Sequence, residues 1–201
     1  MDYFVAVPRD SNVSVRTFGG TLRVSNLQGE LRADAIAGDV TLSSVNRIDV
    51  KALNGNLTIS DSEGEEVNAD TVGGTLQVRN VRARTIELHT VSGPVRVTDV
   101  TCDRCTLTST SGDLELSGPL TPGGKYELRS GVGNIRLAPS GSTGFDVEAR
   151  TNPGRFESEF PLRADPSRTD ARVLYGTFGD GAAIVSLRTF QGTVSIVKGP
   201  R

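Results

Sequence analysis

The sequence predicts an all-β fold, a single-domain parallel β-solenoid whose two-sheet coil repeats about every 19 residues. Small Ser-Gly turns at 92–93 and 111–112 each precede a triplet of apolar, polar and apolar residues. The triplets begin at Val95 and Leu114, so the unit repeats after 19 residues. Alternation with a period of two indicates a half-buried strand. A third observation, the order of the outward charges, selects the solenoid over other β topologies.

The composition restricts the classes of function. With 201 residues, of which 36% are hydrophobic, the chain can bury one sizeable core, and we expect one domain over residues 1–201. Its 22 basic and 24 acidic residues are mixed, so no nucleic-acid surface is predicted. Residues 1–8 do not resemble a signal peptide, and no apolar run approaches the roughly 18 residues of a membrane span. We expect membrane attachment only through a segment outside this chain.

Taken in order, the chain contains two interleaved sets of triplets. The first set follows the turn glycines, at 22–24, 40–42, 57–59, 76–78, 95–97, 114–116, 135–137, 156–158 and 194–196. The second set falls halfway between, at 13–15, 31–33, 48–50, 67–69, 86–88, 105–107, 126–128, 145–147 and 185–187. In each triplet the two outer residues are expected to point inward and the middle one outward.

The outward charges distinguish an antiparallel meander from a coil in which every second triplet stacks in parallel. Just past the second set, successive coils carry Arg16, Asp34, Lys51, Asp70, His89, Thr108, Arg129 and Glu148. The middle positions of the first set carry Arg96, Glu115, Arg136 and Glu157. Opposite signs are favourable on neighbouring strands, which lie about 4.8 Å apart. The alternation therefore favours the parallel solenoid.

The pattern weakens between residues 152 and 182. We expect regular coils over 1–151, an irregular segment or cap over 152–182, and closing strands over 183–201. The irregular segment holds Pro153, Pro161 and Pro166, and proline cannot donate a hydrogen bond to a strand ladder. Tyr175 and Phe178 are the candidates for a cap or an interaction loop.

The most chemical local motif is the C-x-x-C pair, Cys102 and Cys105. Such a pair can be a redox dithiol, half of a zinc site, a local disulfide or two structural thiols. A zinc site lacks further ligands, since the single histidine, His89, is expected to face solvent. Cys105 occupies an inward position in a ladder with Ile86 and Tyr126, and Cys102 is expected in a turn. We therefore predict core thiols ahead of a disulfide.

A second candidate is an acidic outward face made by Glu87, Glu127 and Asp146. Paired carboxylates are what glycoside cleavage requires, and Glu127 and Asp146 are expected to be adjacent. The alternative is a solubilising acidic stripe. We predict no catalytic residues, no metal and no cofactor, with a polysaccharide-binding or polysaccharide-cleaving protein as the alternative function.

The recurring turn-and-triplet motif, at Ser92, at Ser111 and more loosely at 132–135, together with the closing segment 179–196, resembles a bacterial family of adhesin-like domains of unknown function. These domains are built from β-strand repeats and are related to the toastrack domains of envelope-stress proteins. The resemblance implies a non-enzymatic, extracytoplasmic module in the periplasm or at the cell surface. The expected partner is an envelope protein or a glycan, or a second copy bound through the terminal strands.

Overall fold

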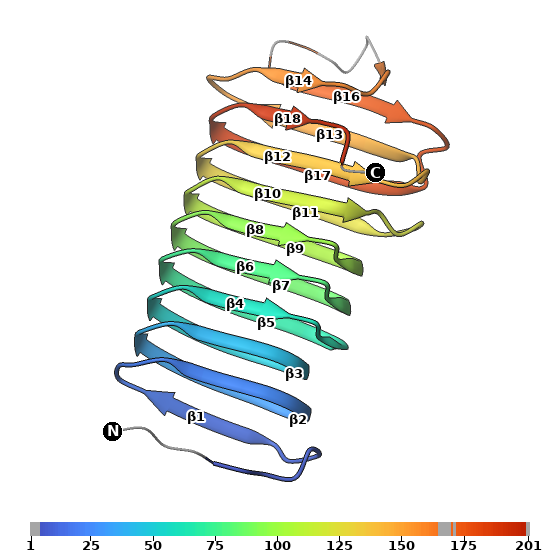
Figure 1. The fold of residues 1–201 in the computed structure, drawn as a ribbon. Coiled ribbons are helices and arrows are strands. Elements are labelled where there is room, and N and C mark those ends of the chain that lie inside the picture. The colour runs from blue at the N-terminus through green and yellow to red at the C-terminus, as the bar shows by residue number, and fades with distance from the viewer. Residues whose placement is uncertain (1–4, 165–169, 171, 200–201) are drawn as a thin grey trace.

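The structure is a computed structural model that describes residues 5–164, 170 and 172–199, and none of these residues is helical. The chain forms an elongated stack of coils wound around one core, which confirms the predicted all-β parallel solenoid (Figure 1). The 18 strands are β1 (Val13–Thr17), β2 (Leu22–Ala37), β3 (Val40–Asn54), β4 (Leu57–Ser60), β5 (Glu63–Gly73), β6 (Leu76–Arg79), β7 (Arg82–Ser92), β8 (Val95–Thr98), β9 (Thr101–Ser111), β10 (Leu114–Pro119), β11 (Lys125–Val132), β12 (Ile135–Ser140), β13 (Phe145–Thr151), β14 (Phe156–Ser158), β15 (Arg163–Ala164), β16 (Val173–Phe178), β17 (Ala183–Gln191) and β18 (Val194–Ile196).

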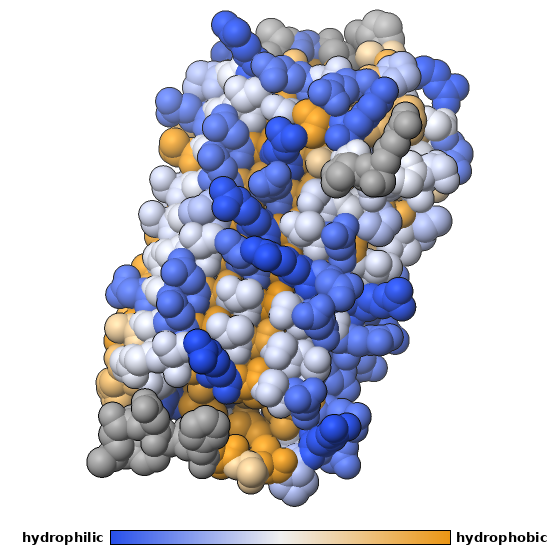
Figure 2. All heavy atoms as spheres, viewed as in Figure 1, coloured by the Kyte–Doolittle hydropathy of each residue, from blue (hydrophilic) through white to orange (hydrophobic). Residues whose placement is uncertain are grey.

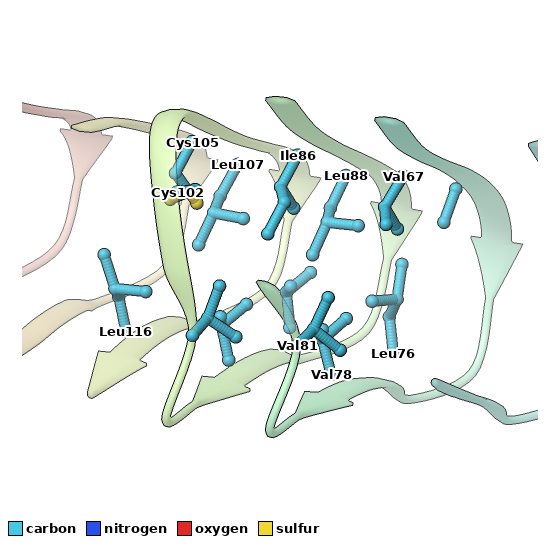
Figure 3. Close-up of a cluster of buried hydrophobic side chains, with 14 of the residues drawn as sticks. Val67, Leu76, Val78, Val81, Ile86, Leu88, Cys102, Cys105, Leu107 and Leu116 are labelled. Atoms are coloured by element: carbon cyan, nitrogen blue, oxygen red, sulfur yellow. The ribbon is translucent and has the colours of Figure 1, made fainter. Parts of the chain in front are cut away.

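Strands of successive coils pair in parallel at the predicted spacing. Val95 pairs with Leu114, and Ile86 pairs with Cys105, each 19 residues further along. Tyr126 continues the second ladder, as predicted. Figure 3 shows part of the core that these inward side chains form. Burying an aliphatic side chain of this size contributes about 1.5–3 kcal/mol, so the stacked ladders are the main source of stability.

Each coil also has a third, short side that the two-sheet prediction did not contain. In β9, Cys102 and Cys105 are buried, whereas both residues between them are exposed. Two consecutive outward side chains break the alternation of a strand, so the chain bends at 103–104. The corner before this side is Asp99, whose φ of 52° lies in the left-handed region that Asp and Asn tolerate. Cys102 therefore lies in a strand, stacked on Ala83, and its predicted place in a turn is wrong.

The predicted turn glycines stack directly on one another at another corner. Gly93 has a φ of 125°, a backbone conformation that L side chains rarely adopt. A Cβ atom there would also collide with the carbonyl oxygen of Gly74 in the preceding coil. Both the backbone conformation and the close approach therefore require glycine.

The last coil in the sequence is not the last coil in space. Strand β17 lies between β11 and β13, and β18 lies between β12 and β14 (Figure 1). The side-chain oxygen of Asn134, just before β12, accepts a 2.9 Å hydrogen bond from the backbone amide of Thr193, just before β18. The closing strands are therefore inserted into the stack.

This insertion changes the phase of β13. Val147, and not Phe145, pairs with Val185, which in turn pairs with Tyr126. Phe145 and Val147 both point inward as predicted, but their alignment with the preceding coils is shifted by two residues, and the fully buried Phe145 extends the core toward the C-terminal end.

The C-terminal end of the stack is closed by antiparallel strands. Strand β16 pairs with β13, and β15 pairs with β16. The rings of Phe145, Phe160 and Phe178 form a cluster beneath them, with centroids between 4.8 and 5.5 Å apart. The irregular segment 152–182 thus contains a cap, and Phe178 is part of it; Pro166 lies outside the described residues.

The N-terminal end is built differently. Strand β1 pairs only with β2 among the described residues, and its outer edge carries no strand pairing there. Residues 5–12 pass this end without forming a strand and are held to the next coil by hydrogen bonds from the amides of Gln28 and Gly29 to the carbonyl of Arg9. Half-buried apolar residues of this end, among them Val13 and Leu22, contact the core. Figure 2 shows apolar surface gathered there.

Candidate functional site

The outward face of the long strands carries the predicted acidic residues. Glu87 pairs with Thr106, and Thr106 pairs with Glu127, so the two glutamates lie in one row, two coils apart. The next residue in this row is Ser186 of the inserted strand, and Glu148 follows it. The sequence-based prediction that Glu87 and Glu127 share one outward row is therefore confirmed.

The predicted pair of adjacent carboxylates is wrong. Asp146 lies opposite Ile184, whereas Glu127 lies opposite Ser186, so the inserted strand and a shift of two residues separate the two carboxylates. Asp146 accepts a 2.6 Å hydrogen bond from the hydroxyl of Thr177. Glu127 forms an ion pair with Arg129 on its own strand. Neither carboxylate faces the other as glycoside cleavage would require.

Three arginines form the neighbouring row near the cap. Arg129 pairs with Arg188, and Arg188 pairs with Arg150. The predicted alternation from Arg129 to Glu148 is therefore wrong. Glu148 instead binds two of these arginines, with distances of 3.2 Å to Arg188 and 2.6 Å to Arg150. Because these pairs are partly solvated, each adds little stability, but together they occupy the carboxylates of Glu127 and Glu148.

Tyr175 joins this cluster from β16. Its hydroxyl accepts a 3.0 Å hydrogen bond from Nη2 of Arg150. That hydrogen bond and the nearby charge of Glu148 raise the pKa of Arg150 above its ordinary value. Tyr175 therefore links the cap to the outward face of β13, while Phe178 lies in the aromatic cluster below.

The other outward row, on the short strands, follows the prediction in part. Glu115 lies 3.6 Å from Arg96 and 3.5 Å from Arg136, as the alternation of charge predicts. Beyond Arg136 the inserted Ser195 intervenes before Glu157, so those two are not neighbours.

A shallow depression of about 300 Å³ lies on the long-strand face in the middle of the stack. All but one of its lining residues are polar or charged, and they come from four successive coils: Asp49, Lys51, Asn68, Asp70, Glu87, Leu88, His89, Thr106 and Thr108. His89 is exposed and lies between Asp70 and Thr108, as predicted. Hydroxyl, amide and charged groups on a flat sheet face offer hydrogen bonds to a hydroxyl-rich ligand.

Both cysteines lie inside the core as free thiols (Figure 3). A hydrogen bond with Cys102, together with burial, raises the pKa of the Cys105 thiol well above its ordinary value. Burial likewise raises the pKa of Tyr126 to about 12. The Tyr126 hydroxyl accepts a 2.8 Å hydrogen bond from the amide of Thr121 and donates one of 3.3 Å to the carbonyl of Cys102. This environment suits structural thiols; the disulfide alternative remains a prediction, and mass measurements with and without reductant test it.

Within the described chain, no group of three or more His, Cys, Asp or Glu residues is arranged to hold a metal ion. No helix long and apolar enough to cross a membrane occurs among the residues whose structure is described.

Sequence reasoning missed a row of exposed apolar residues. Each precedes a turn glycine by two positions: Phe18, Ile36, Leu53, Val72 and Val91. The repeat of an apolar residue at this one outward position was the available signal. The inward triplets on the same strands form the more regular apolar pattern.

The fold and its faces define a repeat protein of the parallel β-solenoid class. Within that class, the chain belongs to the Toastrack DUF4097 family, whose sequence profile matches residues 3–197. This membership confirms the resemblance noted from the sequence, and the family is one of unknown function. No curated protein and no solved structure matches the chain.

Proposed function

We propose that this chain is a non-catalytic interaction or scaffold module of the bacterial envelope, on the extracytoplasmic side, that receives a protein partner at its N-terminal end. The observation that carries the proposal is the outer edge of β1, which has no strand partner among the described residues and lies at the end opposite the antiparallel cap. The assignment to the envelope rests on what the family resemblance implies.

An open strand edge is a template for another strand. Its backbone N–H and C=O groups supply affinity, and the side chains beside it supply specificity. Here the half-buried Val13 lies on that edge strand and provides an apolar contact. Natural proteins cover an edge that has no partner, and the other end of this chain is covered. The partner that fits is an extended segment of an envelope protein.

A photo-crosslinking amino acid at Ser14, an exposed position of β1, tests the proposal in bacterial cells. The matched control places the same group at Glu157, an exposed position of β14 near the capped end. We expect a discrete adduct with an envelope protein at Ser14 and none at Glu157. Adducts of equal yield at both positions, or none at Ser14, would contradict the proposal.

Glycan binding is the second candidate, and the polar depression over four coils favours it. It requires no carboxylate pair, so the separation of Glu127 from Asp146 does not weaken it, whereas that separation removes the support for cleavage. Binding on a glycan array that is lost in Glu87→Gln and kept in Glu157→Gln would favour this candidate. Release of reducing sugar from a bound polysaccharide would overturn the non-catalytic assignment.

A further inference from the structure

An exposed apolar row runs along the N-terminal half of the stack. Its members are 75% exposed at Phe18 and between 39% and 48% exposed at the other four positions, Ile36, Leu53, Val72 and Val91. Single exposed apolar residues are common on soluble proteins, but contiguous ones mark interaction surfaces. We refer to these five residues as the apolar row.

The register of the strands makes this row continuous. Residues on either side of Ile36 pair with those on either side of Leu53, and the same holds for each later member. Phe18 directly follows Thr17, the last residue of β1, which pairs with Ala35. With about 4.8 Å between parallel strands, five members extend over about 19 Å. The apolar row is therefore continuous and narrow, and we call the surface that its five residues form the strip.

Charged residues accompany the strip at a constant distance along each strand. Two residues before the first four members lie Arg16, Asp34, Lys51 and Asp70, which face outward in a neighbouring row. Their signs alternate, and Arg16 forms an ion pair with Asp34 at 3.1 Å. When a row of four alternating charges is placed against a second copy that runs in the opposite direction, every facing pair has opposite signs.

From these observations we propose that the strip is the contact between two copies of this chain whose solenoid axes run antiparallel. The two-fold axis lies along the strand direction, between the coil of Asp34 and the coil of Lys51. In this arrangement Lys51 of one copy faces Asp34 of the other, and Arg16 faces Asp70. Ile36 then faces Leu53 of the other copy, and Phe18 faces Val72. This contact is on the side of the stack and goes beyond the proposed use of the N-terminal end.

Other arrangements of two copies are less favourable. Moving the two-fold axis by half a coil brings like charges opposite each other, for example Asp34 opposite Asp34, which is destabilising. If the two-fold axis instead lies along the solenoid axis, the charged side chains of one copy face the turns of the other copy and have no charged partners there. The self-complementary contact uses the same patch on both copies, as closed two-fold dimers do.

The size of the strip limits the affinity. Stable interfaces bury about 800 Å² on each partner, and a strip about 19 Å long and a few side chains wide buries less. The dimer should therefore form at micromolar concentrations and dissociate on dilution.

Sedimentation velocity over a range of concentrations tests the proposal. We expect a monomer–dimer equilibrium, with Leu53→Lys raising the dimer Kd at least tenfold. The matched control is Ile184→Lys, which changes a residue of similar exposure, 52%, outside the strip. A wild-type chain that stays monomeric up to hundreds of micromolar would overturn the proposal. So would association that Leu53→Lys leaves unchanged, because it would point to the terminal strands instead.

A charge exchange tests the antiparallel register. Lys51→Asp alone should weaken the dimer because it faces Asp34 of the other copy. The double variant Asp34→Lys/Lys51→Asp should restore wild-type affinity, since every facing pair is again of opposite sign. Failure of the second change to rescue the first would overturn the register. Circular dichroism confirms that both variants fold, as these side chains are exposed or half-exposed.

Discussion

At the C-terminal end of the stack, β16 pairs antiparallel with the last parallel strand, and three phenylalanine rings fill the space beneath it. At the N-terminal end, the outer edge of β1 has no strand partner in the described chain, and the apolar residues beside it are only half-buried. A solenoid has two ends of the same kind, and each presents unpaired backbone groups. The difference is that the described structure covers the edge of the last coil with antiparallel strands and shows no such strand on the outer edge of β1, and this contrast is the basis of the partner proposal.

The inserted coil contributes to this difference. Because β17 lies between β11 and β13, its residues pair on both sides. Strand β17 is therefore paired as fully as the strands in the middle of the stack, whereas β1 pairs on one side only among the described residues. The predictions below test this contrast, beginning with the largest expected effect.

The first prediction places a charge at two positions of one core ladder, one in the inserted strand and one at the N-terminal end. Val185, in the inserted strand, is buried between Tyr126 and Val147. Val185→Asp should abolish the cooperative melting transition, since an unpaired buried carboxylate costs several kcal/mol and a domain is stable by only about 5–15 kcal/mol. Val13→Asp, at the half-buried N-terminal position of the same ladder, should lower the Tm by a few degrees. Thermal melts followed by circular dichroism compare the two, and equal losses would show that both ends are equally ordered.

The second prediction compares two phenylalanines. Phe145 is fully buried beneath the cap, whereas Phe18 is largely exposed. Phe145→Ala should lower the free energy of unfolding by about 3–5 kcal/mol because it removes a large side chain and leaves a cavity. Phe18→Ala should change it by less than about 0.5 kcal/mol. Urea denaturation at low protein concentration, where the chain is monomeric, measures both; a large loss in Phe18→Ala would mean that the N-terminal end is closed in solution.

The third prediction concerns the glycine corners. Gly93 in the middle of the stack combines a positive φ with a close approach to Gly74, whereas Gly20, at the N-terminal end, has a positive φ but open space around its Cβ position. Gly93→Ala should cost about 2–3 kcal/mol, and Gly20→Ala about 1 kcal/mol from backbone strain alone. Urea denaturation measures the free energy of unfolding of both variants. The difference between their losses is the cost of the collision between neighbouring coils. If the two costs are the same, neighbouring coils separate easily.

The sequence was sufficient to predict the regular part of this fold, because each coil contacts only its neighbours. The 19-residue spacing from Val95 to Leu114 is the pairing register itself. The inward ladder through Ile86, Cys105 and Tyr126 follows directly from it. In a stacked repeat, a local pattern thus determines the long-range contact.

The same uniformity explains what the sequence could not predict. Every coil offers similar triplets, so nothing in the pattern around Val185 says whether its strand stacks on β11, on β13 or between them. The residue alignment of β13 with the other coils depends on where the inserted strand stacks. The prediction that Glu127 and Asp146 are neighbours assumed an alignment without the insertion, so it failed. The short side that carries Cys102 was missed because two or three residues are too few to show an alternation.

The smallest expected effect lies in the middle of the stack, away from both ends, and depends on pH. In the folded chain, the hydrogen bond with Cys102 and burial keep the Cys105 thiol protonated by raising its pKa. In the unfolded chain, the same thiol loses its proton near its ordinary pKa of about 8.5. Above that pH the folded state holds a proton that the unfolded state has lost, so stability falls as the pH rises. The contribution is complete below about pH 8 and declines as the pH rises above the ordinary pKa of the thiol.

Cys105→Val should therefore reduce the loss of Tm between pH 8 and 10, measured in the presence of reductant. The control is Leu107→Val, which changes the packing of the next inward position on the same strand without removing a thiol, and it should keep the wild-type dependence on pH. Tyr126, whose ordinary pKa of about 10 is raised by burial to about 12, adds the same loss near pH 10 to the wild type and to both variants, so it does not affect the comparison. Identical slopes in the wild type and Cys105→Val would mean that water reaches this thiol. The middle of the stack would then be no better closed than the N-terminal end.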